Sequence, residues 1–189
     1  MITAIDKNTA LVLIDLQKGI AGRPVVHPIK EIFQKSATLV SAFRKEGLPI
    51  VVVNVIPAST GWTKSRKDVM QNMGELPPGF ADIVDEIKTE PTDIFVTKGT
   101  WNAFFNTAMH TELQKRNVTG IVLAGVATSI GVEGTARAAS ELGYNVSLAT
   151  DAMTDMKAEA HENSIKNIFP RLGEVGTTAD ILEKIHSRV

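Results

Sequence analysis

The sequence contains no cysteine among its 189 residues. This absence excludes disulfide bonds, thiolate nucleophiles and cysteine-based metal sites, and it is typical of proteins from a reducing compartment. The four histidines, His27, His110, His161 and His186, include no pair at metal-ligand spacing on one predicted element. We therefore expect neither a metal ion nor another cofactor.

The sequence also lacks an excess of charge of one sign and any long hydrophobic run. Its net charge is −1, with acidic and basic residues mixed along the chain, so no basic stripe is available for nucleic acid. No apolar stretch approaches the roughly 20 residues that a membrane span needs, and residues 1–16 lack the basic region of a signal peptide. We expect a cytoplasmic protein that binds a small-molecule substrate.

What the chain does contain is an alternation of short hydrophobic runs with longer amphipathic ones. Such runs are typical of strands buried on both faces of a parallel sheet. The sequence predicts an α/β fold in a single domain, 1–189: a three-layer sandwich around a mostly parallel, Rossmann-like, doubly wound sheet of about six strands. Predicted strands cover 10–15, 49–55, 93–98, 120–126 and 145–150, with a short one near 174–178. Predicted helices cover 29–46, with Gly47 ending the helix, and about 107–116, 157–169 and 179–187. A further predicted helix has Thr128 or Ser129 as its N-cap and ends before Gly143.

The segment 57–92 interrupts this alternation. It holds four prolines and three glycines. Long loops in compact domains are often functional, so we expect this one, with Trp62, Lys64 and Arg66, to select the substrate, and a short helix over 80–88 to lie within it.

The residues at the carboxyl ends of the predicted strands carry most of the chemistry. They are Asp15, Asn54, Lys98, Thr128–Gly131 and Asp151. Ligands bind beyond these ends in open α/β sheets. Asp15 suits a general acid or base, or it caps the next turn; Lys98 is a functional cation or a surface residue. A doubly wound sheet would put these two on neighbouring strands, whereas we interpret Asp151 as a structural residue that turns the chain.

Other candidates have equally plausible structural interpretations. The turn 125–134 opens a helix, and glycine in its first turn lets a ligand approach the backbone N–H groups that the helix leaves unpaired; alternatively, the glycine allows close packing of helix against strand. Trp62 and Trp101 are either partly buried packing residues or residues that line the walls of a pocket. Glu133 and Arg137, four residues apart, favour an intrahelical ion pair.

Three segments together resemble the isochorismatase-like hydrolase family over essentially the whole chain: LVLIDLQKG, TKGTWNAF and LAGVATSIGVEGTARAASELGYNVSLATDAMTD. In most members an Asp, a Lys and a Cys form the site, and the cysteine attacks an amide or similar carbonyl. The resemblance places these three on Asp15, Lys98 and Gly131, and it implies a cis peptide at Val126–Ala127. It also implies a homodimer or larger assembly.

A glycine at position 131 excludes thiol chemistry there. The chain is similar in this respect to the isochorismatase branch, which cleaves the vinyl ether of isochorismate to pyruvate and a dihydroxy-dihydrobenzoate. The resemblance then implies that Asp15 is the general acid, that Lys98 orients it or holds a substrate carboxylate, and that Gly131 leaves space for substrate. We expect substrate contacts from Gln17, Trp62, Trp101, Ala127, Thr128 and Ser129.

Isochorismatases usually continue the lysine segment with an Arg and a Ser, where this chain has Gly99–Asn102 before Ala103. Two alternatives therefore stay open beside the vinyl-ether hydrolase. One is a binding or regulatory protein on a hydrolase scaffold, and the other is an amidase in which Ser129 or Thr128 is the nucleophile.

Overall fold

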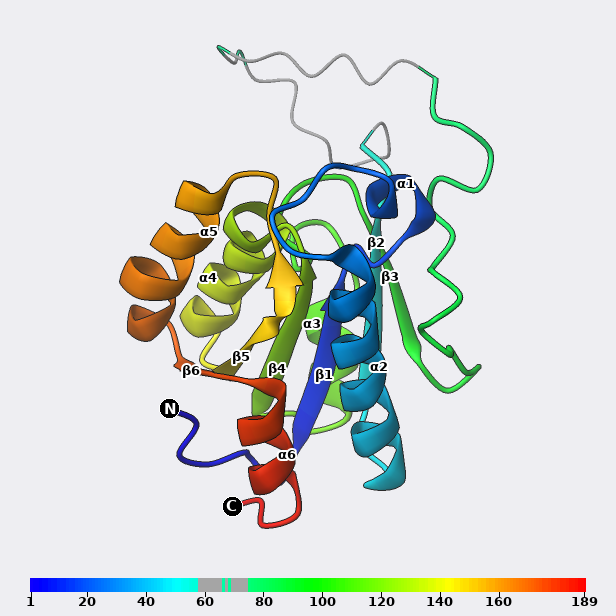
Figure 1. The fold of residues 1–189 in the computed structure, drawn as a ribbon. Coiled ribbons are helices and arrows are strands. Elements are labelled where there is room, and N and C mark those ends of the chain that lie inside the picture. The colour runs from blue at the N-terminus through cyan, green and yellow to red at the C-terminus, as the bar shows by residue number, and fades with distance from the viewer. Residues whose placement is uncertain (58–65, 67, 69–74) are drawn as a thin grey trace.

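The computed structural model describes residues 1–57, 66, 68 and 75–189, and its centre is a six-stranded parallel sheet (Figure 1). The order of the strands is β3-β2-β1-β4-β5-β6, so the chain winds from β1 to one edge and then from β4 to the other. The predicted α/β fold class is thereby confirmed. The strands are β1 (Thr9–Ile14), β2 (Ile50–Val55), β3 (Ile94–Lys98), β4 (Gly120–Val126), β5 (Asn145–Thr154) and β6 (Glu174–Gly176).

Helices cover both faces of the sheet and make the three layers. In Figure 1, α2 and α6 lie in front of the strands, α3 and α4 lie behind them, and both chain ends lie at the lower end. The helices are α1 (Lys18–Ala21), α2 (Ile29–Lys45), α3 (Met109–Lys115), α4 (Glu133–Glu141), α5 (Ala158–Asn163) and α6 (Thr178–Ile185). A π-helical turn, Thr128–Val132, precedes α4, and further irregular turns, Ser164–Ile168 and Phe169–Arg171, follow α5.

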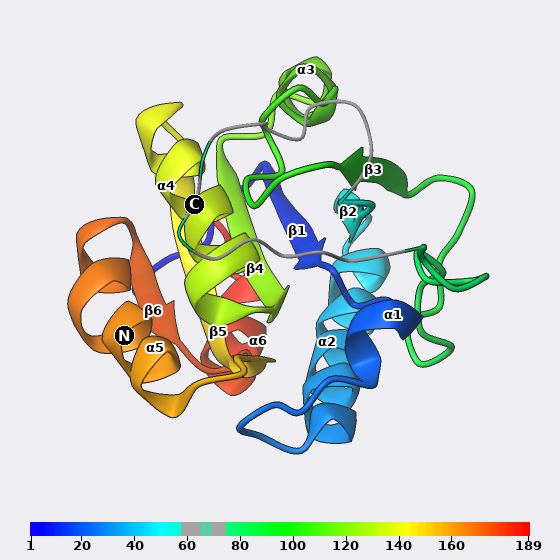
Figure 2. The same ribbon diagram turned by 90° about the horizontal axis from the view of Figure 1, so that it is seen from above.

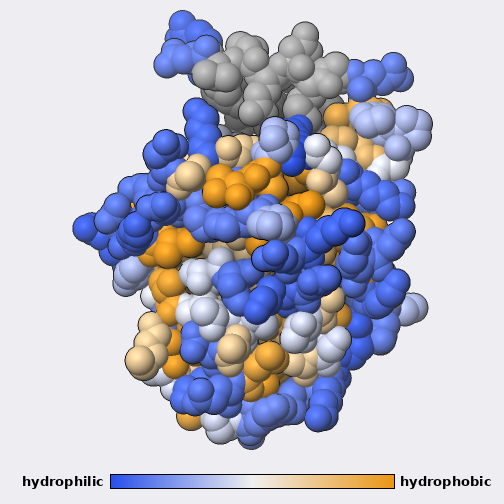
Figure 3. Space-filling view, in the orientation of Figure 1, coloured by the Kyte–Doolittle hydropathy of each residue, from blue (hydrophilic) through white to orange (hydrophobic). Residues whose placement is uncertain are grey.

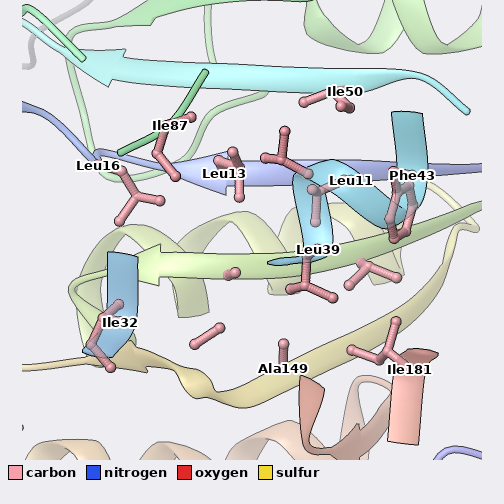
Figure 4. Packing of buried hydrophobic residues seen from close by; sticks show 14 of the residues in the cluster. Leu11, Leu13, Leu16, Ile32, Leu39, Phe43, Ile50, Ile87, Ala149 and Ile181 are labelled. Atoms are coloured by element: carbon pink, nitrogen blue, oxygen red, sulfur yellow. The ribbon is translucent and has the colours of Figure 1, made fainter. Parts of the chain in front are cut away.

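Each face of the sheet has its own hydrophobic core, because successive side chains of a strand point to opposite faces. Leu11 and Leu13 of β1 pack toward Leu39 and Phe43 of α2 (Figure 4), whereas Val12 lies in the cluster on the opposite face. All of these side chains are buried. Gly47 ends α2 with a φ of +66°, as expected of a glycine just past a helix.

The predicted helix over 80–88 is wrong. Phe80, Val84 and Ile87 have helical spacing and are buried, but the segment that carries them forms turns and not a helix. The backbone bonds of this segment go to the chain around β1 and β2 instead: the Val84 N–H donates to Leu16 O, and Asn54 Nδ2 donates to Ala81 O. Periodicity alone does not separate the two arrangements.

The predicted strand 145–150 ends too early. β5 continues to Thr154 after a register shift opposite Leu123–Gly125, so Asp151 lies inside the strand and does not turn the chain. Asp151 is nevertheless held by structural contacts, because its Oδ1 accepts from Thr178 N and Oγ1 at 2.6 and 2.8 Å. The residue that follows the true end of the strand is Asp155.

On the face shown in Figure 3, hydrophobic residues gather toward the upper end of the molecule, and hydrophilic residues cover much of the rest. Arg137 Nη2 lies 2.8 Å from Glu133 Oε1, which confirms the predicted intrahelical pair. No helix in the described parts of the chain is both long and apolar enough to cross a membrane.

Candidate active site

Asp15 stands at the point where the winding of the sheet reverses, directly after β1. Its backbone has a φ of +52°, a left-handed conformation that Asp tolerates better than most residues. The Asp15 N–H still donates to Val53 O of β2, and Gln17 N donates back to Asp15 O. This tight turn directs the carboxyl group into the crevice beyond the strands, the usual ligand position in open α/β sheets. Within the described residues, Lys98 donates to Oδ2 of the carboxylate, Oδ1 has no partner and no turn N–H donates to either oxygen, so Asp15 is not a cap.

Lys98 ends β3 and reaches the Asp15 carboxylate. Lys98 Nζ lies 2.7 Å from Asp15 Oδ2 and also donates to Thr100 O at 3.1 Å. The expectation of neighbouring strands is wrong, because β2 lies between β1 and β3. The long lysine side chain spans the intervening strand, and only 1% of Lys98 is exposed, so it is not a surface residue. Figure 2 looks down on this end of the sheet.

The Asp15 carboxyl group is tuned by two opposing effects. Burial raises its pKa, and the positive charge and hydrogen bond of Lys98 lower it by less, so that the pKa is raised to about 6. Asp15 Oδ1 is buried and has no hydrogen-bond partner among the described residues. A carboxyl group in this state can hold a proton close to neutral pH and deliver it to a bound molecule.

Gly131 faces this pair. A Cβ atom at position 131 would lie 3.3 Å from both Asp15 Oδ2 and Lys98 Nζ, and 2.9 Å from Ile14 Cγ2. The glycine therefore keeps open a space that touches the acid and the ammonium group at once. The structure brings Asp15, Lys98 and Gly131 to one point, from three separate elements of the chain.

The turn between β4 and α4 forms the floor of the site. The Val126–Ala127 peptide is cis, as the resemblance implied, and Val126, Ala127, Ile130 and Gly131 line the pocket. Neither Thr128 nor Ser129 lines it.

The hydroxyl groups of Thr128 and Ser129 are engaged elsewhere. Thr128 Oγ1 is hydrogen-bonded to His161 Nδ1 at 2.8 Å, and Ser129 donates through N and Oγ to Asp155 Oδ2 at 2.7 and 2.8 Å. Both hydroxyl groups therefore have protein partners, and the substrate contacts predicted for these two residues stay predictions. Neither side chain caps the helix, because the π-helical turn starts after Ala127 without a side-chain cap.

The walls of the pocket are largely apolar. The pocket has a volume of about 120 Å³. Trp101 is 60% exposed and belongs to the wall rather than the core, whereas Trp62 lies outside the described residues. Apolar walls around a few convergent polar groups are typical of sites for small molecules. Apolar wall residues are Ile20, Val55, Phe80, Trp101, Ile130 and Met156.

Gln17 does not line the pocket, contrary to the prediction of a substrate contact. Its side chain is fully buried and makes the hydrogen bonds to the Val55 backbone that a neighbouring strand would otherwise make. Oε1 accepts from Val55 N at 2.7 Å, and Nε2 donates to Val55 O and Phe80 O. Gln17 thus joins the end of β2 to the segment that carries Phe80.

We expect Gln17→Ala to lower the free energy of unfolding by about 3 kcal/mol, because it leaves buried backbone groups of Val55 without partners. The control is Gln34→Ala on the exposed face of α2, which should change the value by less than about 0.5 kcal/mol. Urea unfolding followed by circular dichroism measures both. Equal stabilities, together with a raised KM for Gln17→Ala alone, would restore a substrate role.

Sequence reasoning missed several residues at the site. Arg23, Phe80 and Met156 line the pocket, and Asp155 fixes Ser129 beside it. None of these residues lies at the end of a predicted strand. Asp155 directly follows the observed end of β5, so a predicted strand of the correct length would have identified it. In the described part of the chain, no group of three His, Asp or Glu residues could hold a metal ion.

Comparison with known proteins gives a consistent result. The Isochorismatase domain family matches residues 9–180. The isochorismatase family protein YwoC of Bacillus subtilis is 40% identical over 182 residues, which cover 95% of each chain. The ureidoacrylate amidohydrolase RutB of Caulobacter segnis is 28% identical over 92% of this chain and 84% of its own length.

A solved structure agrees with these relatives. An isochorismatase family protein from Burkholderia thailandensis superposes with a TM-score of 0.93 at 36% identity, over 98% of this chain and all of the other.

Proposed function

The chain belongs to the isochorismatase family of hydrolases, and from this premise we propose that it cleaves a small vinyl ether, such as that of isochorismate, with Asp15 as general acid. No covalent intermediate forms. The observation that carries this proposal is a buried carboxyl group with a raised pKa and an unpartnered oxygen, beside the open space over Gly131.

The proposed reaction has three steps. Asp15 donates its proton to the terminal carbon of the enol ether, which leaves an oxocarbenium ion. Water then adds to the cationic carbon and returns a proton to the Asp15 carboxylate. The resulting hemiketal breaks into a ketone and an alcohol. Lys98 stabilises the Asp15 carboxylate while the cation exists, and its hydrogen bond at 2.7 Å fixes the carboxyl orientation.

The absence of a nucleophile at position 131 supports this route over acyl transfer. Water attack on an oxocarbenium ion needs room but no attacking side chain. A side chain at position 131 would occupy the space between the acid, the ammonium group and Ile14.

The direct experiment is to incubate the purified protein with isochorismate and follow pyruvate release. A set of simple enol ethers and simple amides is tested in parallel. Pyruvate release well above the spontaneous rate supports the proposal. Turnover of amides without any turnover of enol ethers would contradict it.

Amide hydrolysis is the second candidate, because RutB is named as an amidohydrolase. A nucleophile for this reaction would have to reach the pocket, and Thr128 and Ser129 do not line it. Thr100 is the one hydroxyl-bearing residue that lines the pocket in the described part of the chain. Mass spectrometry after treatment with an acylating probe tests this candidate, and a label on Thr100 would favour it.

The state of Asp15 should set the pH dependence of hydrolysis. Burial holds its pKa at about 6, and a general acid acts only while protonated. We therefore expect kcat/KM to be highest below about pH 6 and to fall about tenfold per unit above it. Measurements with isochorismate across that range check this. A rate that rises with pH would contradict the role of Asp15 as an acid.

A further inference from the structure

One short segment, 154–161, binds two parts of the chain that lie on different sides of the pocket. It starts at the last residue of β5 and runs into α5. Its partners are the turn between β4 and α4, which carries Gly131, and the connection between α1 and α2, which also contributes to the lining. Figures 1 and 2 show this connection running from α1 toward the β5–α5 side and back to α2.

Two side chains bind the turn between β4 and α4 to this segment. Thr128 Oγ1 is hydrogen-bonded to His161 Nδ1 at 2.8 Å, and both residues are buried. Ser129 Oγ donates to Asp155 Oδ2 at 2.8 Å. Because Gly131 belongs to the same π-helical turn, these two bonds help to fix its position against the pocket.

The connection between α1 and α2 is bound at the same place. Val26 N donates to Asp155 O at 2.8 Å. His27 N donates to Thr154 Oγ1 at 3.2 Å, and His27 Nδ1 lies 3.0 Å from the same oxygen. The His27 ring also contacts the His161 ring, with 4.6 Å between the ring centroids. These two residues, which we call the histidine pair, therefore meet where both sides of the pocket are held.

The threonine hydroxyl groups indicate the protonation state of both rings. Thr128 Oγ1 is buried, and its one hydrogen-bond partner among the described residues is His161 Nδ1. Thr154 Oγ1 already accepts from His27 N, so its own proton is available for His27 Nδ1. A buried hydroxyl proton needs an acceptor, and Nδ1 accepts only where it carries no proton. Each ring therefore suits its threonine as a neutral imidazole with the proton on Nε2.

Protonation of the rings would disturb both contacts. A proton on Nδ1 turns this nitrogen from an acceptor into a donor, so the proton of the threonine hydroxyl loses its partner. Two positively charged rings at a centroid distance of 4.6 Å also repel each other. The hold on the turn and the hold on the connection should therefore weaken together.

The surroundings of His161 favour the neutral ring. Burial lowers the pKa of His161 below its usual range, and the nearby His27 lowers it further. Asp155 and Glu162 raise this pKa by less. The packed π-helical turn carries no charged residue, and other charged residues on the neighbouring elements are Arg23, Glu133, Lys157, Glu159 and Lys166. His161 is therefore neutral at neutral pH and takes up a proton only in more acidic solution.

We propose that His27 and His161 are positioning residues that hold the two sides of the pocket together while neutral, and that protonation of the pair releases the connection between α1 and α2 and loosens the turn at Gly131. The proposal rests on the proposed function only for the statement that this pocket is the reacting site. The opening itself is tested without turnover.

The test is hydrogen–deuterium exchange of the whole protein, measured by mass spectrometry at about pH 7.5 and about pH 5, on either side of the ordinary histidine pKa of about 6.5. Each rate is divided by the intrinsic rate of the same peptide at that pH. The closed state lowers the pKa of His161, so its stability relative to the open state is lost as the pH falls. We expect segments 22–28 and 126–132 to exchange about tenfold faster, in these relative terms, at the lower pH.

Asparagine is the informative replacement, because it places a carbonyl oxygen near the position of Nδ1 and cannot ionise. The double variant His27→Asn with His161→Asn should stay closed at both pH values. The matched control is His186→Asn, which removes an exposed histidine that pairs with Glu46 at 2.9 Å, and it should open as the unaltered protein does. Asp15→Asn should open as well, which separates this effect from the titration of Asp15.

Equal relative exchange at both pH values, or opening that persists in the double variant, overturns the proposal. If the double variant does not fold, nitrogen NMR of the unaltered protein decides: a proton on Nδ1 of either ring at neutral pH overturns the proposal, and a proton on Nε2 of both supports it. Acid opening that the double variant lacks supports the histidine pair even if no enol ether is hydrolysed, in which case only the proposed reaction fails. Where hydrolysis is seen, KM should rise toward acid pH in the unaltered protein and not in the double variant.

Discussion

Asp15→Asn should lower kcat for hydrolysis by about 10²- to 10⁴-fold, because the asparagine side chain has no proton to give to the substrate. The change keeps the size of the side chain, so the pocket retains its shape. The introduced amide also cannot ionise near pH 6, and the residual activity should lose the pH dependence expected of the original carboxyl group. Steady-state rates of pyruvate release, measured over a range of pH, give both results.

The matched control for this change is Asp85→Asn. The Asp85 side chain is 89% exposed, and it forms a surface ion pair with Lys18 at 3.8 Å. This variant should keep full activity, because exposed pairs contribute little to stability. Circular dichroism shows whether Asp15→Asn is still folded. A folded Asp15→Asn protein with undiminished kcat would remove Asp15 from the mechanism.

Gly131→Ala should lower kcat/KM by about 10²-fold, because a misplacement of about 1 Å at a reacting centre has an effect of this size. The added methyl group would lie 3.3 Å from both Asp15 Oδ2 and Lys98 Nζ, within the space that we assign to the reacting atoms. It would also meet Ile14 Cγ2 at 2.9 Å, so the Ile14 side chain must shift.

Gly134→Ala, in the same helical segment, is the control. A Cβ atom at position 134 would approach Trp101 Cβ to 3.4 Å, an ordinary contact, and alanine is a better helix former than glycine. This variant should be active and at least as stable as the unaltered protein. If Gly131→Ala were as active as Gly134→Ala, the reacting atoms would have to lie elsewhere in the pocket.

Much of the architecture could be predicted from the sequence because it depends on local patterns. Unbroken apolar runs identify strands that are covered on both faces, and the longer amphipathic segments between them require helices. The residues at or just beyond the carboxyl ends of such runs must lie at one end of the sheet. Asp15, Lys98 and Gly131 were found in this way, and the family resemblance grouped them.

The tertiary structure decided which nearby residues share the pocket. Gln17, Thr128 and Ser129 lie close in sequence to Asp15 and Gly131, yet none of them lines the pocket. Each side chain instead satisfies a buried hydrogen-bond partner: Val55, His161 and Asp155, respectively. Such partners come from distant parts of the chain, so no local pattern reveals them.

The tertiary structure likewise decided how distant residues meet. Arg23 reaches the pocket because its connection is anchored to β5, more than a hundred residues further along the chain, and Lys98 reaches Asp15 across an intervening strand. The sequence by itself determined which elements form and which end of the sheet carries the chemistry, since hydrophobic periodicity is a local property. Side-chain direction, hydrogen-bond partners and the position of a loop over the crevice depend on long-range packing, and these were decided only when the chain folded.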